Sequence, residues 1–174
     1  MNKTLLATAL VAVVATTAFA PTAQAANTGT ITISGKVLAD TCTVSINGGA
    51  TVALPTVMTG AFAAVGDTAG TKPFTVNLSG CDSNTTTATM AFSGSNIDAG
   101  TGNLKNTSVG GSNVQVQLLN GASVINTSSN NNAPVISLTS GAGSASMSAR
   151  YIATSASTSA GMVASTVNFT LSYQ

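Results

Sequence analysis

Apolar and polar residues alternate along much of the chain, with the period of two that indicates a half-buried β-strand. Glycine- and asparagine-rich turn signals, such as Asn120-Gly121, separate these stretches. The stretches with this alternation are residues 31–37, 74–79, 90–92, 114–118, 145–153 and 167–173. Beyond the apolar N-terminal segment, the chain lacks the apolar spacing of a helix of three turns. The pattern therefore predicts an all-β fold, a β-sandwich in which each sheet has one apolar face.

The first 25 residues have the layout of a secretory signal peptide. Lys3 supplies a positive start, residues 5–20 are apolar, and Ala23-Gln24-Ala25 forms a small-x-small cleavage site. A transmembrane anchor is the alternative, but the apolar run is short for a bilayer, which needs about 20 apolar residues. We expect export, with residues 26–174 as the mature chain.

The charge balance argues against several functional classes. Only 5% of the residues are charged, the formal net charge is +1, and the chain contains no His and no Glu. A nucleic-acid-binding surface would need a basic patch, and most general-base and zinc chemistry needs His or Glu. An enzyme built on the few Asp residues and a closed apolar-ligand barrel remain as alternatives. We expect no catalytic residue, no cofactor and no metal.

The two cysteines are most simply interpreted as a disulfide. Cys42 and Cys81 are 39 positions apart, and an isolated cysteine pair in an exported chain usually forms a disulfide. Closing a loop of this size stabilises the fold by roughly 4 kcal/mol in the chain-entropy model. Two free buried thiols are the alternative.

The two ends of the mature chain are both strand-like. Residues 28–37 alternate without a turn that would fold them back before Cys42, and residues 167–174 form a strong strand that reaches the last position. A strand at the edge of a sheet leaves N–H and C=O groups unpaired, and these can pair with another chain. The sequence thus offers a free strand at one end and a candidate open edge at the other.

These segments resemble the major structural subunits of type 1 fimbriae, which the chaperone–usher pathway assembles. The resemblance covers most of the mature chain in the same order, and it includes the cysteine spacing and the penultimate Tyr173. The matching segments are residues 29–37, Cys42, 74–82, 90–94, 97–100, 149–154 and 169–174.

The resemblance implies an incomplete immunoglobulin-like β-sandwich that lacks its last strand. Residues 1–25 would then be the signal peptide, 26–40 an N-terminal donor-strand extension and 41–174 the pilin domain. A periplasmic chaperone would lend a strand to the open groove, and at the outer-membrane usher the extension of the next subunit would replace that strand. Identical or related subunits would thereby form a fimbrium for cell adhesion on the surface of a Gram-negative bacterium. No nucleic-acid partner and no membrane segment after signal cleavage are expected.

The resemblance also assigns roles to individual residues. The Cys42–Cys81 pair matches the disulfide of the family. The last position, Gln174, would supply the carboxylate that basic residues of the chaperone hold. The donor strand would present Gly29, Ile31, Ile33, Gly35 and Val37, and the acceptor groove or chaperone site would present Val167, Phe169, Leu171, Tyr173 and Gln174.

Two further interpretations remain open at this point. The chain could be a minor adaptor subunit of the same type of fimbria, or a monomeric exported binding protein that shares only the fold. A tip adhesin fits less well, because it needs a separate receptor-binding domain in addition to the pilin domain.

Overall fold

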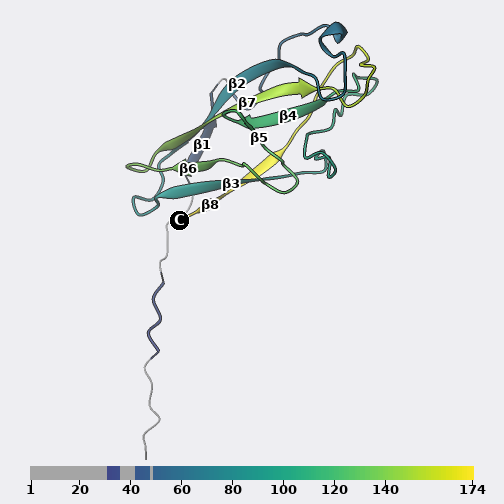
Figure 1. Ribbon diagram of the computed structural model, residues 1–174. Coiled ribbons are helices and arrows are strands. Elements are labelled where there is room, and N and C mark those ends of the chain that lie inside the picture. Colours follow the sequence, from purple (N-terminus) through teal and green to yellow (C-terminus); the bar gives the residue numbers. More distant parts are fainter. Residues whose placement is uncertain (1–30, 36–41, 48) are drawn as a thin grey trace, which may run out of the picture. The chain divides into compact units, whose positions relative to one another are not determined.

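The computed structural model describes residues 31–35, 42–47 and 49–174. The chain divides into two units, Met1–Gly35 and Lys36–Gln174. The described part of the second unit is a sandwich of two antiparallel sheets, as the alternation predicted (Figure 1). The predicted signal peptide, residues 1–25, lies outside the described residues.

The larger sheet has five strands in the order β1-β2-β7-β4-β5. Two of its inner strands, β2 and β7, are long and pair with each other over most of their lengths. The strands of this sheet are β1 (Thr43–Ile46), β2 (Thr68–Ser79), β4 (Gln115–Asn120), β5 (Ser123–Val124) and β7 (Gly143–Ile152).

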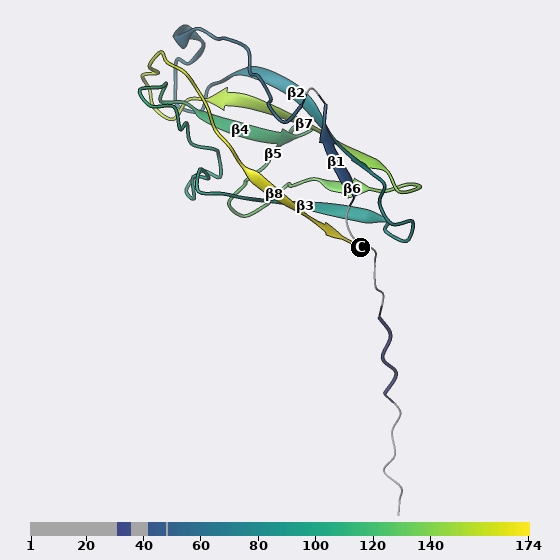
Figure 2. The same cartoon turned by 180° about the vertical axis from the view of Figure 1, so that it is seen from behind.

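The smaller sheet has three strands in the order β6-β3-β8. They are β6 (Val135–Ser137), β3 (Thr87–Ser93) and β8 (Asn168–Tyr173). The last strand, β8, lies beside β3 in both views and ends close to the C-terminus (Figures 1 and 2). A single turn of 3-10 helix, η1 (Thr59–Ala61), lies in the connection between β1 and β2.

The core lies between the two sheets, where alternate side chains of each sheet meet. In β7, for example, Ala145, Met147 and Ala149 are buried while the residues between them are more exposed. The larger sheet contributes Val76, Leu78, Val116, Leu118 and Met147, and the smaller sheet contributes Ala88, Met90, Phe92 and Ile136. The period-two pattern in the sequence is therefore the inward and outward alternation of these strands.

A bulge interrupts the pairing of β2 with β7 between Ala69 and Lys72. Gly70 occupies it with a φ of +68°, and a Cβ atom there would lie 2.8 Å from the ring of Tyr151. Glycine fits for two reasons: its backbone tolerates positive φ, and its missing side chain leaves room for the ring. The bulge thus seats Tyr151 at the end of β7.

Within the described residues, no helix is long and apolar enough to cross a membrane.

Candidate functional site

An apolar cleft of about 940 Å³ opens into the sandwich between the two sheets. Its floor consists of core side chains from both sheets, so the cleft is a place where the core is unfinished. None of the residues that line it carries a charge. The floor includes Val76, Val116, Leu118, Met147 and Tyr151 of the larger sheet and Met90, Phe92 and Phe169 of the smaller one.

Two segments without regular strand structure form the walls of this cleft. One wall is made by residues 50–54 and 56–59, after β1, and the other by residues 158–167, before β8. No hydrogen bond in the described part of the chain joins the first wall to the second. The two walls are thus not joined by hydrogen bonds, although Val57 of the first and Val163 of the second pack against one small apolar cluster.

The last strand borders the cleft and has one free edge. β8 pairs with β3 through residues such as Phe169, which faces Phe92, and Leu171, which faces Met90. Among the described strands, β3 is the only partner of β8. The N–H and C=O groups on its other edge are therefore available for a strand from elsewhere.

The predicted acceptor residues divide into two groups. Val167 and Phe169 line the cleft, whereas Leu171 and Tyr173 pack against the core beyond it. All four side chains are half-buried. Gln174 pairs back to β3, because its main-chain oxygen, part of the carboxylate named above, accepts hydrogen bonds from the N–H groups of Thr86 at 2.7 Å and Thr87 at 3.1 Å.

The wall before β8 continues the alternation of that strand. Half-buried Val163, Ser165 and Val167 alternate with exposed Ala164 and Thr166. The Ser165 hydroxyl oxygen is the one buried side-chain polar atom in the described residues without a hydrogen-bond partner. A buried polar group without a partner is costly, so this hydroxyl marks a point where the cleft is incomplete.

The ionisable groups with shifted pKa values leave the cleft uncharged. Burial raises the pKa of the Tyr151 phenol, which keeps this cleft residue neutral. Asp98 is not among the cleft residues. Its pKa is lowered by hydrogen bonds from the Thr101 N–H, the Gln115 side chain and the Gly100 N–H, and by Lys105 nearby. The cleft therefore suits an apolar segment rather than a charged ligand.

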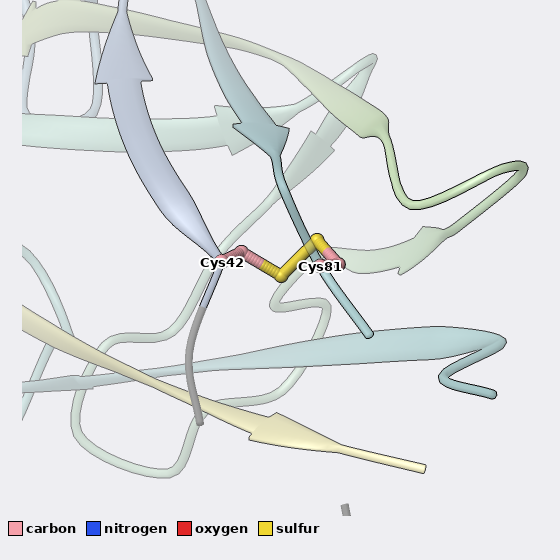
Figure 3. Close-up of a disulfide and its surroundings, with 2 residues drawn as sticks. All are labelled: Cys42 and Cys81. Atoms are coloured by element: carbon pink, nitrogen blue, oxygen red, sulfur yellow. A yellow bond between two sulfur atoms is a disulfide. The ribbon is translucent and has the colours of Figure 1, made fainter. Parts of the chain in front are cut away.

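The predicted disulfide is confirmed. The Cys42 and Cys81 sulfurs are bonded at 2.04 Å. The bond joins the start of β1 to the segment that follows β2 (Figure 3). Since β1 has only four residues and pairs in register with β2, the bond fastens the strand from which the first wall continues.

The described part of the predicted donor segment is residues 31–35, which have no regular secondary structure. Ile31 is 87% exposed and Ile33 is 90% exposed. Isoleucine is normally a core residue, but both of these side chains are exposed. Gly29 and Val37 lie outside the described residues.

Neither wall of the cleft was predicted from the sequence. Residues 50–59 include Pro55 and have no clear period, and residues 158–166 are mostly small side chains. The available signal was the spacing of Val163, Ser165 and Val167, which continues the alternation of β8 upstream. Two residues conceal this alternation, because apolar Ala164 is at an exposed position and polar Ser165 is at a half-buried one.

Comparisons with known proteins agree with this geometry. The profile of the family described as fimbrial protein matches residues 31–174. The chain is 44% identical over 106 residues to the major fimbrial subunit SMF-1 of Stenotrophomonas maltophilia (strain K279a). That alignment covers 59% of this chain and 62% of the relative, which is less than two thirds of the relative's length.

Two solved structures share the fold. The Burkholderia pseudomallei antigen and type I fimbria protein BPSL1626 superimposes with a TM-score of 0.57 at 29% identity, covering 77% of this chain and 90% of that one. The P pilus rod subunit PapA superimposes with a TM-score of 0.62 at 17% identity, covering 78% and 100% respectively, and supports the fold alone. With a family profile that spans most of its length and an immunoglobulin-like sandwich in common, the chain belongs to the fimbrial protein family.

Proposed function

We propose that this protein is a structural, non-enzymatic subunit of a chaperone–usher fimbria that polymerises by donor-strand exchange. The observation that carries the proposal is the uncharged cleft beside the free edge of β8, in a chain that also has an exposed alternating apolar segment near its start. The N-terminal extension of one copy, residues 26–40, fills the cleft of the next.

The donor segment and the acceptor edge match in length and pattern. Inward-facing positions recur every second residue in both, and extended strands rise by about 3.3 Å per residue in each. A nine-residue donor therefore spans a nine-residue edge. The five donor positions are Gly29, Ile31, Ile33, Gly35 and Val37, and the five edge positions are Val163, Ser165, Val167, Phe169 and Leu171.

Burial of the donor side chains provides the main driving force. Ile31 and Ile33 are almost fully exposed, and moving such a side chain out of water contributes about 1.5–3 kcal/mol each. Main-chain hydrogen bonds to the free edge of β8 add about 0.5–1.5 kcal/mol net apiece. Main-chain pairing supplies affinity and the alternate side chains supply specificity, as in other strand additions.

The contact is heterologous, because the extension of one copy enters a different surface of the next. A heterologous contact that does not close on itself propagates as a filament. The protein is exported through the periplasm, where a pilus chaperone fills the cleft and basic residues of the chaperone hold the Gln174 carboxylate. An outer-membrane usher then exchanges the chaperone for the next subunit, and the fimbrium on the surface of a Gram-negative bacterium serves cell adhesion.

The test is a gel of material sheared from the cell surface, run in SDS with and without strong heating and detected with antibody to this chain. The expected result is a ladder of multiples that collapses to one band on heating. Ile33→Asp should abolish the ladder, whereas the matched control Thr32→Asp, on the opposite face of the extended segment, should retain it. A single band in both wild-type lanes, released as soluble protein, would refute the proposal.

A further inference from the structure

The wall before β8 is held in place by side chains rather than by sheet pairing. Residues 153–167 connect β7 to β8 and contain no strand or helix. Backbone N–H and C=O groups in such a segment still need partners wherever they are shielded from water. They find many of these partners in one other connection, residues 94–114 between β3 and β4, and three asparagines in it supply most of the side-chain contacts.

Asn113 holds the first part of the connecting segment. Its Nδ2 donates to the Ser155 hydroxyl and to the Ser157 carbonyl, each at 2.8 Å. Its Oδ1 accepts from the Ser159 N–H at 2.9 Å, and its own carbonyl accepts from the Thr154 hydroxyl at 2.8 Å. One side chain thus fixes the chain where it enters the cleft wall.

Asn106 holds the middle of the wall. Its Nδ2 donates to the Met162 carbonyl at 2.8 Å and to the Ser112 carbonyl at 2.7 Å. Its Oδ1 accepts from the N–H groups of Ala164 at 2.9 Å and Ser108 at 3.0 Å. All four hydrogen-bonding positions of the amide are therefore used, two of them on the wall and two on its own connection.

Asn96 and two backbone contacts complete the attachment. Asn96 Nδ2 donates to the Thr166 hydroxyl at 2.9 Å and to the Thr166 carbonyl at 3.2 Å. Between the asparagines, the N–H of Thr107 donates to the Ala164 carbonyl at 2.8 Å and that of Ser112 to the Met162 carbonyl at 3.1 Å. The wall is anchored at successive points while its opposite side faces the cleft.

We propose that Asn96, Asn106 and Asn113 are positioning residues for strand uptake, and that they hold residues 158–167 as a preformed upstream extension of the β8 edge. This inference rests on the proposed function. Because the wall is already ordered, it does not lose conformational freedom when a strand binds. A disordered wall would lose that freedom, and the loss would oppose binding. The asparagines would thus govern how readily the cleft accepts a donor while contacting no donor residue themselves.

The test measures uptake of a fluorescent synthetic peptide, with the sequence of residues 26–40, by the full mature chain. Asn106→Ala and Asn113→Ala are the variants. Asn126→Ala is the matched control, because Asn126 also accepts two backbone N–H bonds, from Ser128 and Ser129, yet its side chain has no hydrogen bond with residues 153–167. If the wall of a variant holds the ordered, binding-competent conformation only about one tenth of the time, the apparent affinity for the peptide falls about tenfold.

The expected result is a tenfold or greater loss of uptake in both wall variants, with a shift in thermal midpoint no larger than that of Asn126→Ala. Amide hydrogen exchange adds a local readout. The amides of Ala164 and Ser112 should lose protection in the empty Asn106→Ala chain, while amides in β2 should keep theirs. A wall variant that binds the peptide with wild-type affinity, or whose affinity falls only as much as that of the control, would overturn the inference.

The outcomes separate this inference from the function on which it rests. If the wild-type chain fails to bind the peptide, the proposed strand acceptance itself is wrong. If the wild-type chain binds the peptide but not its Ile33→Asp version, strand acceptance stands, and the asparagine variants alone decide the role of the wall.

Discussion

Replacing Phe169 by alanine should weaken donor binding more than it weakens the empty subunit. Phe169 is half-buried, lines the cleft and faces Phe92 across the pair of β3 with β8. Truncation of a fully buried phenylalanine to alanine lowers the free energy of unfolding by about 3–5 kcal/mol. Since only part of that burial exists in the empty subunit, we expect a loss of about 2 kcal/mol there. A further loss of about 2 kcal/mol should appear only when a donor covers the ring.

The second loss can be measured as an affinity. A change of about 2 kcal/mol corresponds to roughly 30-fold weaker binding of the peptide with the sequence of residues 26–40. Fluorescence titration of the mature chain gives this value directly, and denaturant unfolding without peptide gives the loss in the empty state.

Ile97→Ala is the matched control for this experiment. Ile97 is also half-buried, but it packs against the core outside the cleft and is not one of the edge positions proposed to receive the donor. Its truncation should lower the free energy of unfolding and leave the peptide affinity within about twofold of wild type. Equal effects of the two substitutions on peptide affinity would refute the assignment of Phe169 to the acceptor surface.

Three further predictions concern other parts of the fold. Reduction of the Cys42–Cys81 disulfide should lower the free energy of unfolding by about 4 kcal/mol, as measured by denaturant unfolding with and without dithiothreitol. Ser165→Ala should stabilise the empty subunit by about 1 kcal/mol, because it removes a buried hydroxyl without a partner; an equal gain in the peptide-filled state would show that the donor does not satisfy this hydroxyl. The folded-state pKa of Asp98 is lowered from 3.8, so its contribution is complete above that pH and is lost as the pH falls below it. Asp98→Asn should therefore reduce the fall in the free energy of unfolding at acid pH, as measured by urea unfolding. An unchanged fall would contradict the hydrogen-bonded carboxylate.

The long strands of the sandwich were predictable from alternation alone. β2, β7 and β8 each carry several apolar residues at every second position. This spacing has the period of a strand and does not match the period of 3.6 residues that a helix needs. The short strands were not predicted. β5 has two residues and β6 has three, so neither is long enough to display a period, and their pairing depends on β4 and β3.

The cleft was harder to predict than the strands because it is defined by a missing neighbour. The pattern of β8 shows which side chains face inward, and two of them, Val167 and Phe169, line the cleft. The same pattern cannot show how far the cleft extends along β8, since Leu171 and Tyr173 continue the alternation but do not line the cleft. The wall also depends on contacts between Asn106 and residues more than fifty positions away, and no local pattern reports such a contact.

The edges of the two sheets support an acceptor role for β8 more strongly than its apolar residues do. Proteins usually protect an exposed edge by keeping the strand short or by placing charges or proline on it. Among the described edge strands, β5, β6 and β1 have only two, three and four residues, whereas β8 has six residues and contains no charge and no proline. The alternation of β8 continues upstream to Val163, which lengthens the unprotected edge still further. An edge of this kind in an isolated protein would invite aggregation, so its persistence is best explained if a specific strand normally covers it.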